Sequence, residues 1–300
     1  MTTELLVLRA GELTLELGPA CGGSILRLQE RTPAGAIDWL RPASPETVAR
    51  CDPMGVASFP LVPFSNRIRD ARFPIGGRTV QLPLNWPPER HALHGDGWQH
   101  PWTVAAASET QAELIFEWTA PDHPLAYTAR QLFALSEAEL RIEIAVTNRC
   151  DGPMPAGIGV HPWFPLTPQA RMTADLPWVW LVDEEYMPIE RAPTPPHFDF
   201  GRGLAFAGTN VANSFAGWDG RAVIEWPEHG RRLTLLAEEP LRHLVLYAPD
   251  RADFFCVEPV SNSVDAFNLG PQGVPDVGYI VLQQNETLSG RVCFVLEHTA

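Results

Sequence analysis

Alternation of apolar and polar residues, repeated in one short segment after another, is the feature that most constrains the fold of this 300-residue chain. In residues 139–148 (ELRIEIAVTN), the aliphatic residues Leu140, Ile142, Ile144 and Val146 fall at every second position. A period of two is that of a β-strand, whose side chains point alternately to opposite faces of the sheet. Five further segments show strand patterns: 112–119, 221–226, 231–237, 243–248 and 290–298. Turn-forming clusters separate them and long amphipathic helical patterns are almost absent, so we predict an all-β fold, a large antiparallel β-sandwich.

The number of domains is limited by what lies between these segments. The 30 prolines and 23 glycines are scattered between predicted strands and do not gather in a linker, and we find no repeat of fixed period. With 45% hydrophobic residues, the chain can bury a sizeable core. We therefore expect a single domain over residues 1–300.

Charge and hydropathy restrict the partners. The formal net charge is −14, so the chain lacks the basic surplus with which proteins bind nucleic acid. No segment approaches eighteen apolar residues, so we expect no membrane partner. The N-terminal segment carries acidic residues and alternates from its start, unlike a secretory signal. We expect a cytoplasmic protein, a monomer or homodimer, with a neutral small-molecule ligand.

The five cysteines, Cys21, Cys51, Cys150, Cys256 and Cys293, are an odd and widely spaced set without a C-x-x-C motif. This spacing indicates neither a disulfide framework nor a zinc site, and we expect reduced cysteines in the core. The chain also lacks H-E-x-x-H, G-x-S-x-G, a phosphate-binding loop and a dinucleotide fingerprint. We therefore expect no metal and no cofactor.

Four segments carry polar residues that the strand pattern does not explain: 59–73, 90–102, 157–166 and 255–268. In 157–166 (GIGVHPWFPL), His161 stands alone in an apolar run, as either a core histidine with satisfied hydrogen bonds or a proton-transfer group. Glu258 follows the apolar run FFCV, where partial burial would raise its pKa and make it a better base near neutrality. Arg67 is either the partner in a surface ion pair or a ligand contact. His94 is either a turn residue or a ligand contact.

In this order, four motifs resemble those of the aldose 1-epimerase (galactose mutarotase) family. They are PFSNRI at 63–68, LHGDGW at 93–98, GVHPWF at 159–164 and VEPVSNSVDAFN at 257–268. Any one of them is weak evidence, but the ordered set spans nearly the whole chain. Within the family, the sequence looks most like a bacterial mutarotase-like subgroup. The resemblance implies a β-sandwich of the galactose mutarotase-like supersandwich type, with a sugar in an open cleft on one sheet.

The resemblance also implies roles for individual residues. Glu258 would be the general base and His161 the general acid of sugar ring opening and reclosure. His94 and Arg67 would bind sugar hydroxyls, and Asn66 would support Arg67 or contact the edge of the ligand. These residue types suit the chemistry, because a carboxylate and an imidazolium can exchange protons with the anomeric hydroxyl and the ring oxygen in both directions.

Two positions near the expected cleft carry alternatives. Trp163 stands where the family often has tyrosine, and would either face the sugar ring or pack in the core. The family commonly has an aspartate a few residues before a phenylalanine in the region that here reads TNVANSFAGWDG, and this chain has Ala212 there. Asp219 is the nearest carboxylate and would either replace that sugar contact or shape the DG turn.

Three functions are compatible with these motifs. The first is an isomerase that interconverts the α and β anomers of a free aldose. The second is a hexose-6-phosphate 1-epimerase, which would need basic residues near the cleft; Arg69, Arg72 and Arg90 are candidates, while the net charge favours a neutral sugar. The third is a non-catalytic sugar-binding module, which would not need both Glu258 and His161.

Overall fold

The computed structural model describes residues 5–33 and 35–299, and it confirms the predicted antiparallel β-sandwich. The first four residues of the N-terminal segment lie outside this range. The larger sheet contains, in spatial order, β1 (Leu6–Ala10), β2 (Leu13–Gly18), β3 (Ser24–Thr32), β5 (Ser58–Leu61), β15 (Gly159–Pro165), β24 (Phe254–Val260), β23 (His243–Ala248), β20 (Val211–Ala216), β17 (Trp178–Val182) and β18 (Pro188–Pro193), with β4 (Gly35–Asp38) paired to β3.

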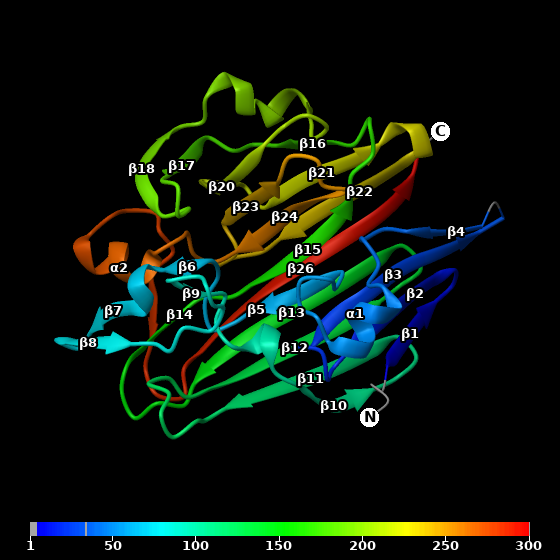
Figure 1. Cartoon of the computed structure of the whole chain (residues 1–300). Coiled ribbons are helices and arrows are strands. Elements are labelled where there is room, and N and C mark those ends of the chain that lie inside the picture. The colour runs from blue at the N-terminus through cyan, green and yellow to red at the C-terminus, as the bar shows by residue number, and fades with distance from the viewer. Residues whose placement is uncertain (1–4, 34, 300) are drawn as a thin grey trace.

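The second large sheet lies against the first (Figure 1). It contains, in spatial order, β10 (Thr103–Ala107), β11 (Gln111–Trp118), β12 (Tyr127–Leu135), β13 (Glu139–Asn148), β26 (Thr287–His298), β22 (Arg231–Ala237), β21 (Arg221–Trp226), β16 (Arg171–Ala174) and β19 (Leu204–Ala205). All six strand segments predicted from the sequence are strands, and the segment at 139–148 is β13, whose even-numbered residues from Leu140 to Val146 are buried.

Smaller elements complete the structure. Three strand pairs are β14 (Met154–Ala156) with β25 (Ile280–Leu282), β6 (Arg67–Ile68) with β9 (Ala92–Leu93), and β7 (Arg72–Ile75) with β8 (Arg78–Gln81). The helices are α1 (Pro45–Arg50), α2 (Ala266–Leu269) and six short 3₁₀ turns: η1 (Arg69–Ala71), η2 (Gly97–Gln99), η3 (Pro196–Phe198), η4 (Phe200–Arg202), η5 (Pro227–His229) and η6 (Gly270–Gln272). In Figure 1, α2 and the pairs β6–β9 and β7–β8 gather at one end of the sandwich, on the left. Within the described residues, no helix is long and apolar enough to cross a membrane.

The two faces of the larger sheet differ in what covers them. On β24, Phe255 and Val257 point into the main core between the sheets, whereas Cys256 and Val260 belong to a second apolar cluster on the opposite face. That second cluster also contains residues from outside the sheet, among them Trp98 of the 3₁₀ turn at residues 97–99. Because both faces are covered, the central strands are buried almost throughout, which explains the long apolar run around His161.

One expectation about the cysteines is wrong. Cys21 and Cys51 form a disulfide, while Cys150, Cys256 and Cys293 are free thiols. Cys51 ends α1, whose N-terminus is capped by the Ser44 side chain, and this short helix carries Cys51 next to the turn that contains Cys21. A separation of 30 residues matches no sequence motif for a disulfide. The pairing therefore depends on where α1 places Cys51.

Candidate active site

His161 and Glu258 are brought together by the pairing of two central strands. The register of β15 and β24 pairs Gly159 with Val260 and Trp163 with Cys256, which puts His161 opposite Glu258. Both side chains leave the sheet on the face opposite to the main core, since their neighbours Val160 and Val257 point into that core. Strand register therefore joins two residues that lie 97 positions apart in the sequence.

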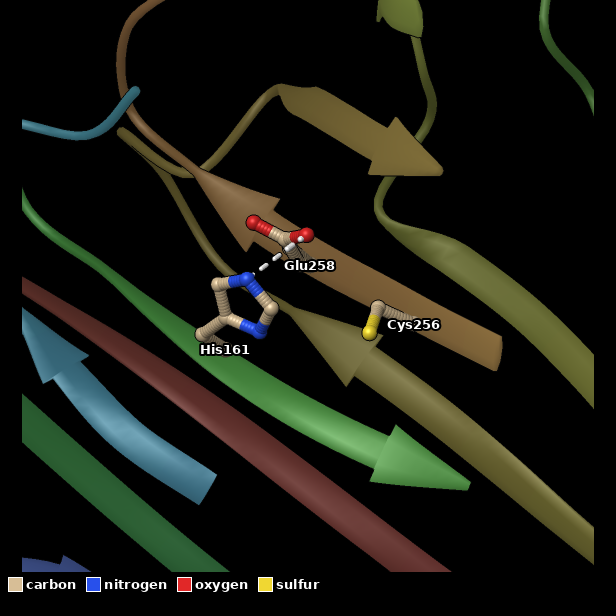
Figure 2. Close-up of side chains that lie close together, drawn as sticks. All are labelled: His161, Cys256 and Glu258. Carbon is tan, nitrogen blue, oxygen red and sulfur yellow. Dashed lines mark ion pairs between the residues drawn. The ribbon is translucent and has the colours of Figure 1, made fainter. Parts of the chain in front are cut away.

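Figure 2 shows the two side chains facing each other. His161 Nε2 lies 3.3 Å from Glu258 Oε1, and both side chains are buried. Burial lowers the pKa of His161 to about 3, and burial raises the pKa of Glu258 well above its ordinary value. Burial thus opposes charge on either partner, and the contact lets a proton pass between the two groups.

The aromatic residues around His161 fix the plane of its ring. Trp163 stacks on it with ring centroids 4.3 Å apart, and Phe59 lies against it at 4.6 Å. Trp163 is buried, and the Arg41 guanidinium lies 5.0 Å from its ring centroid. Of the two interpretations of Trp163, the structure matches core packing. By stacking on His161, Trp163 also orients the imidazole ring.

His94 and Asn66 hold each other through two backbone contacts. The Asn66 backbone N–H donates to His94 Nδ1 at 3.0 Å, and the His94 backbone N–H donates to the Asn66 carbonyl at 2.9 Å. Because Nδ1 accepts a hydrogen bond and burial lowers the pKa of His94 well below its ordinary value, its proton lies on Nε2. Both residues have positive φ, 59° for His94 and 60° for Asn66, and both line the cavity described below.

Arg67 is held by a partner that we did not predict from the sequence. Its Nε lies 2.9 Å from Glu89 Oε2, and its guanidinium lies 5.0 Å from the Tyr186 ring centroid. The Asn66 side chain accepts a hydrogen bond from the Arg67 backbone at 2.9 Å, so Asn66 supports the backbone of Arg67. Glu89 comes from an irregular loop and Tyr186 from the β17–β18 turn, and neither segment carries a sequence pattern that points to a site.

These side chains surround a cavity of about 230 Å³. His161, Glu258, His94, Arg67 and Asn66 all line it. Lining residues that the sequence analysis missed include Met54, Trp86, Glu89, Tyr186, Ser214 and Tyr247.

This chain has Ala212 in the region where the family commonly has an aspartate. Ala212 and Ser214, two residues apart on β20, both line the cavity, and the Ser214 hydroxyl is buried without a hydrogen-bond partner in the described residues. Asp219 is not a lining residue. Its carboxylate accepts the Arg221 backbone N–H at 2.9 Å, so it shapes the turn, and a sugar contact by Asp219 does not fit this placement.

The arginines that could recognise a phosphate lie elsewhere. Arg69 pairs with Asp265, Arg90 pairs with Asp70 and Glu185, and none of these arginines lines the cavity. Arg72 donates to Gln81 and also lies outside the cavity. Among the described residues, Arg67 is the one arginine of the cavity lining, and Glu89 already offsets its charge.

Cys256 joins the pair from the same strand as Glu258 (Figure 2). Its Sγ, a ring nitrogen of His161 and a Glu258 carboxylate oxygen lie within 4.8 Å of one another, and all three residues are buried. The sequence analysis treated Cys256 as a core residue, because the i, i+2 spacing with Glu258 indicates a shared strand face but not the histidine opposite.

The antiparallel sandwich and the ordered motifs agree with one protein family. Residues 5–294 match the aldose 1-epimerase family, and the chain belongs to that family. This confirms the resemblance found in the four motifs.

Particular relatives support the same assignment. The chain is 35% identical over 234 residues to the uncharacterized protein YphB of Escherichia coli K12, covering 75% of this chain and 79% of YphB. A crystal structure from Escherichia coli K12, named provisionally as an aldose 1-epimerase, is 31% identical with a TM-score of 0.89, over 98% of this chain and 99% of that one. A galactose mutarotase-like protein from Clostridium acetobutylicum shares the fold, with 21% identity, a TM-score of 0.85 and coverage of 98% and 95%.

Proposed function

We propose that this protein is a mutarotase, which interconverts the α and β anomers of a free aldose by opening and reclosing the sugar ring. The observation that supports this most is the buried contact of 3.3 Å between His161 and Glu258 at a cavity of about 230 Å³. In such a pair, a proton on either group makes that group an acid and leaves its partner as the base. Mutarotation needs such a combination, because one oxygen of the sugar loses a proton while another gains one.

The proton movements follow from the two groups. The anomeric hydroxyl donates a hydrogen bond to Glu258. This bond favours the carboxylate form of Glu258, so the proton between the two groups moves to His161. Glu258 then removes the proton from the anomeric oxygen while His161 gives its proton to the ring oxygen, and the C1–O5 bond breaks. After rotation about C1–C2, the same two transfers in reverse close the ring on the other face. Each group need contribute about 10²–10⁴-fold to the rate.

The remaining polar groups of the cavity would hold the sugar. His94 offers its Nε2–H as a donor, and Arg67 offers guanidinium N–H groups beside Glu89. Ser214 supplies a hydroxyl that has no other partner in the described part of the chain. Together these donors and acceptors suit a ring that carries several hydroxyl groups. We also propose that the enzyme acts in the cytoplasm.

A free aldose fits the charges better than a sugar phosphate. The alternative substrate, hexose 6-phosphate, carries up to two negative charges. In the cavity, the positive charge of Arg67 is already offset by Glu89. A phosphate placed there would compete with a carboxylate for the same guanidinium. We therefore assign the neutral sugar to the cavity.

Polarimetry tests this proposal. Freshly dissolved α-glucose and α-galactose should reach their equilibrium rotation faster with the protein than in buffer, and pretreatment with a chelator should not reduce this rate. Faster equilibration of glucose 6-phosphate alone would favour the phosphate enzyme. Sugar binding without any acceleration would identify a binding module and overturn the proposal.

A further inference from the structure

We propose that Cys256, His161 and Glu258 form a binding site for a soft divalent cation, represented by Zn²⁺ or Cd²⁺, beside the cavity. Their three donor atoms lie within 4.8 Å of one another, and His161 Nε2 and Glu258 Oε1 are 3.3 Å apart. Tetrahedral bonds of 2.0–2.3 Å leave donor atoms about 3.3–3.8 Å apart. A shift of about 1 Å in the Cys256 or Glu258 side chain therefore completes the geometry.

The donor set selects the kind of metal. A thiolate, an imidazole and a carboxylate are the ligands of zinc and its heavier relative cadmium, whereas Mg²⁺ and Ca²⁺ take oxygen ligands almost throughout. The thiolate and the carboxylate together carry two negative charges, which offset a divalent cation in a buried position. On binding, a metal–sulfur bond replaces the S–H bond of Cys256, and the thiol proton passes to solvent together with any proton on the Glu258 carboxyl.

The site is open on one side. His161 and Glu258 line the cavity, whereas Cys256 does not. Three protein ligands leave a fourth position for water, as in zinc sites that are not structural. His161 Nδ1 is buried and has no hydrogen-bond partner in the described residues, so the support that usually strengthens a metal-bound histidine is missing here. We therefore expect reversible binding that is weaker than that of a structural zinc site.

Metal and sugar would exclude each other, since both need the lone pairs of His161 and Glu258. The cation would then inhibit anomer interconversion competitively. This consequence rests on the proposed function, whereas the binding of the metal does not. The two are therefore tested by separate measurements.

Cadmium binding can be measured directly, because a thiolate–Cd²⁺ bond gives an ultraviolet charge-transfer band. The chelator-treated protein should develop this band with one Cd²⁺ per chain. Cys256→Ser and Cys256→Ala should abolish it, while His161→Asn should keep the band and weaken binding at least tenfold. The matched variants Cys150→Ser and Cys293→Ser remove the other free thiols and should leave the band unchanged.

The outcomes separate the two proposals. A wild-type protein without the band, or a band that survives in folded Cys256 variants, overturns the metal site, and circular dichroism establishes that those variants are folded. A band without mutarotase activity keeps the site and rejects the proposed function. Activity that cadmium inhibits in the wild type, with a sugar-dependent inhibition constant, supports both.

Discussion

His161 and Glu258 meet across β15 and β24 with 3.3 Å between Nε2 and Oε1, and Trp163 stacks on the imidazole. The stacking restricts the plane of the ring, and Nε2 is the nitrogen that lies nearest Glu258. This arrangement leaves the Nδ1 atom buried without a partner in the described residues. A group held in this way is suited to exchange a proton only through Nε2.

Replacing His161 should remove one of the two proton-transfer groups. We expect His161→Asn to lower kcat for anomer interconversion by about 10²–10⁴-fold, because no other group at that position can protonate the ring oxygen. Far-ultraviolet circular dichroism should remain that of the wild type. An unchanged kcat in a folded variant would show that His161 is a core histidine.

Ser214 should affect binding and not the chemical step. We expect Ser214→Ala to raise KM by about 2–10-fold with little change in kcat, because one hydrogen bond contributes about 0.5–1.5 kcal/mol. Ser289→Ala, at an exposed position on β26, is the matched control and should change neither constant. A fall in kcat with KM unchanged would place Ser214 in the chemical step and contradict this role.

The fold was predictable because alternation reports directly on which strand faces are buried. Residues 139–148, 221–226, 231–237 and 243–248 are strands with the predicted bounds. The motifs also named residues that gather in space: His161, Glu258, His94, Arg67 and Asn66 all line one cavity, and their roles stay predictions.

Other parts of the site could not be predicted, because they depend on how distant segments meet. Glu89 reaches Arg67 from an irregular loop, and Ser214 belongs to a strand whose register the sequence does not state. The role proposed for Cys256 depends on the closeness of His161 on the neighbouring strand. The Cys21–Cys51 disulfide depends likewise on the position of α1.

The state of the cysteines can be counted. In denaturant without reductant, we expect three reactive thiols per chain, those of Cys150, Cys256 and Cys293, and five after reduction. Replacing Cys21 and Cys51 with alanine should lower the free energy of unfolding by about 2–4 kcal/mol, since the cross-link restricts the unfolded chain. Five thiols before reduction would show that the two cysteines are not joined.

His243 should make stability depend on pH. Burial lowers its pKa to about 4 from an ordinary value of 6.5, so between these values the unfolded chain binds a proton that the folded chain does not. The free energy of unfolding should therefore fall as the pH drops from about 6.5 to about 4, with no such penalty above 6.5.

The variant His243→Gln isolates this contribution. Its stability should fall less than that of the wild type between pH 7 and pH 5, as measured by denaturant unfolding. Equal losses in the two proteins would mean that His243 is not buried in its neutral form.

The most direct test of the central claim is the exchange rate between anomers at equilibrium, measured by NMR exchange spectroscopy on glucose and galactose. The wild-type protein should add exchange between the α and β signals, and Glu258→Gln should reduce that contribution by about 10²–10⁴-fold. Glu117→Gln, the same change at an exposed position on β11, should leave the exchange rate as in the wild type. Wild-type exchange no faster than in buffer, or full exchange in a folded Glu258→Gln protein, would contradict the account.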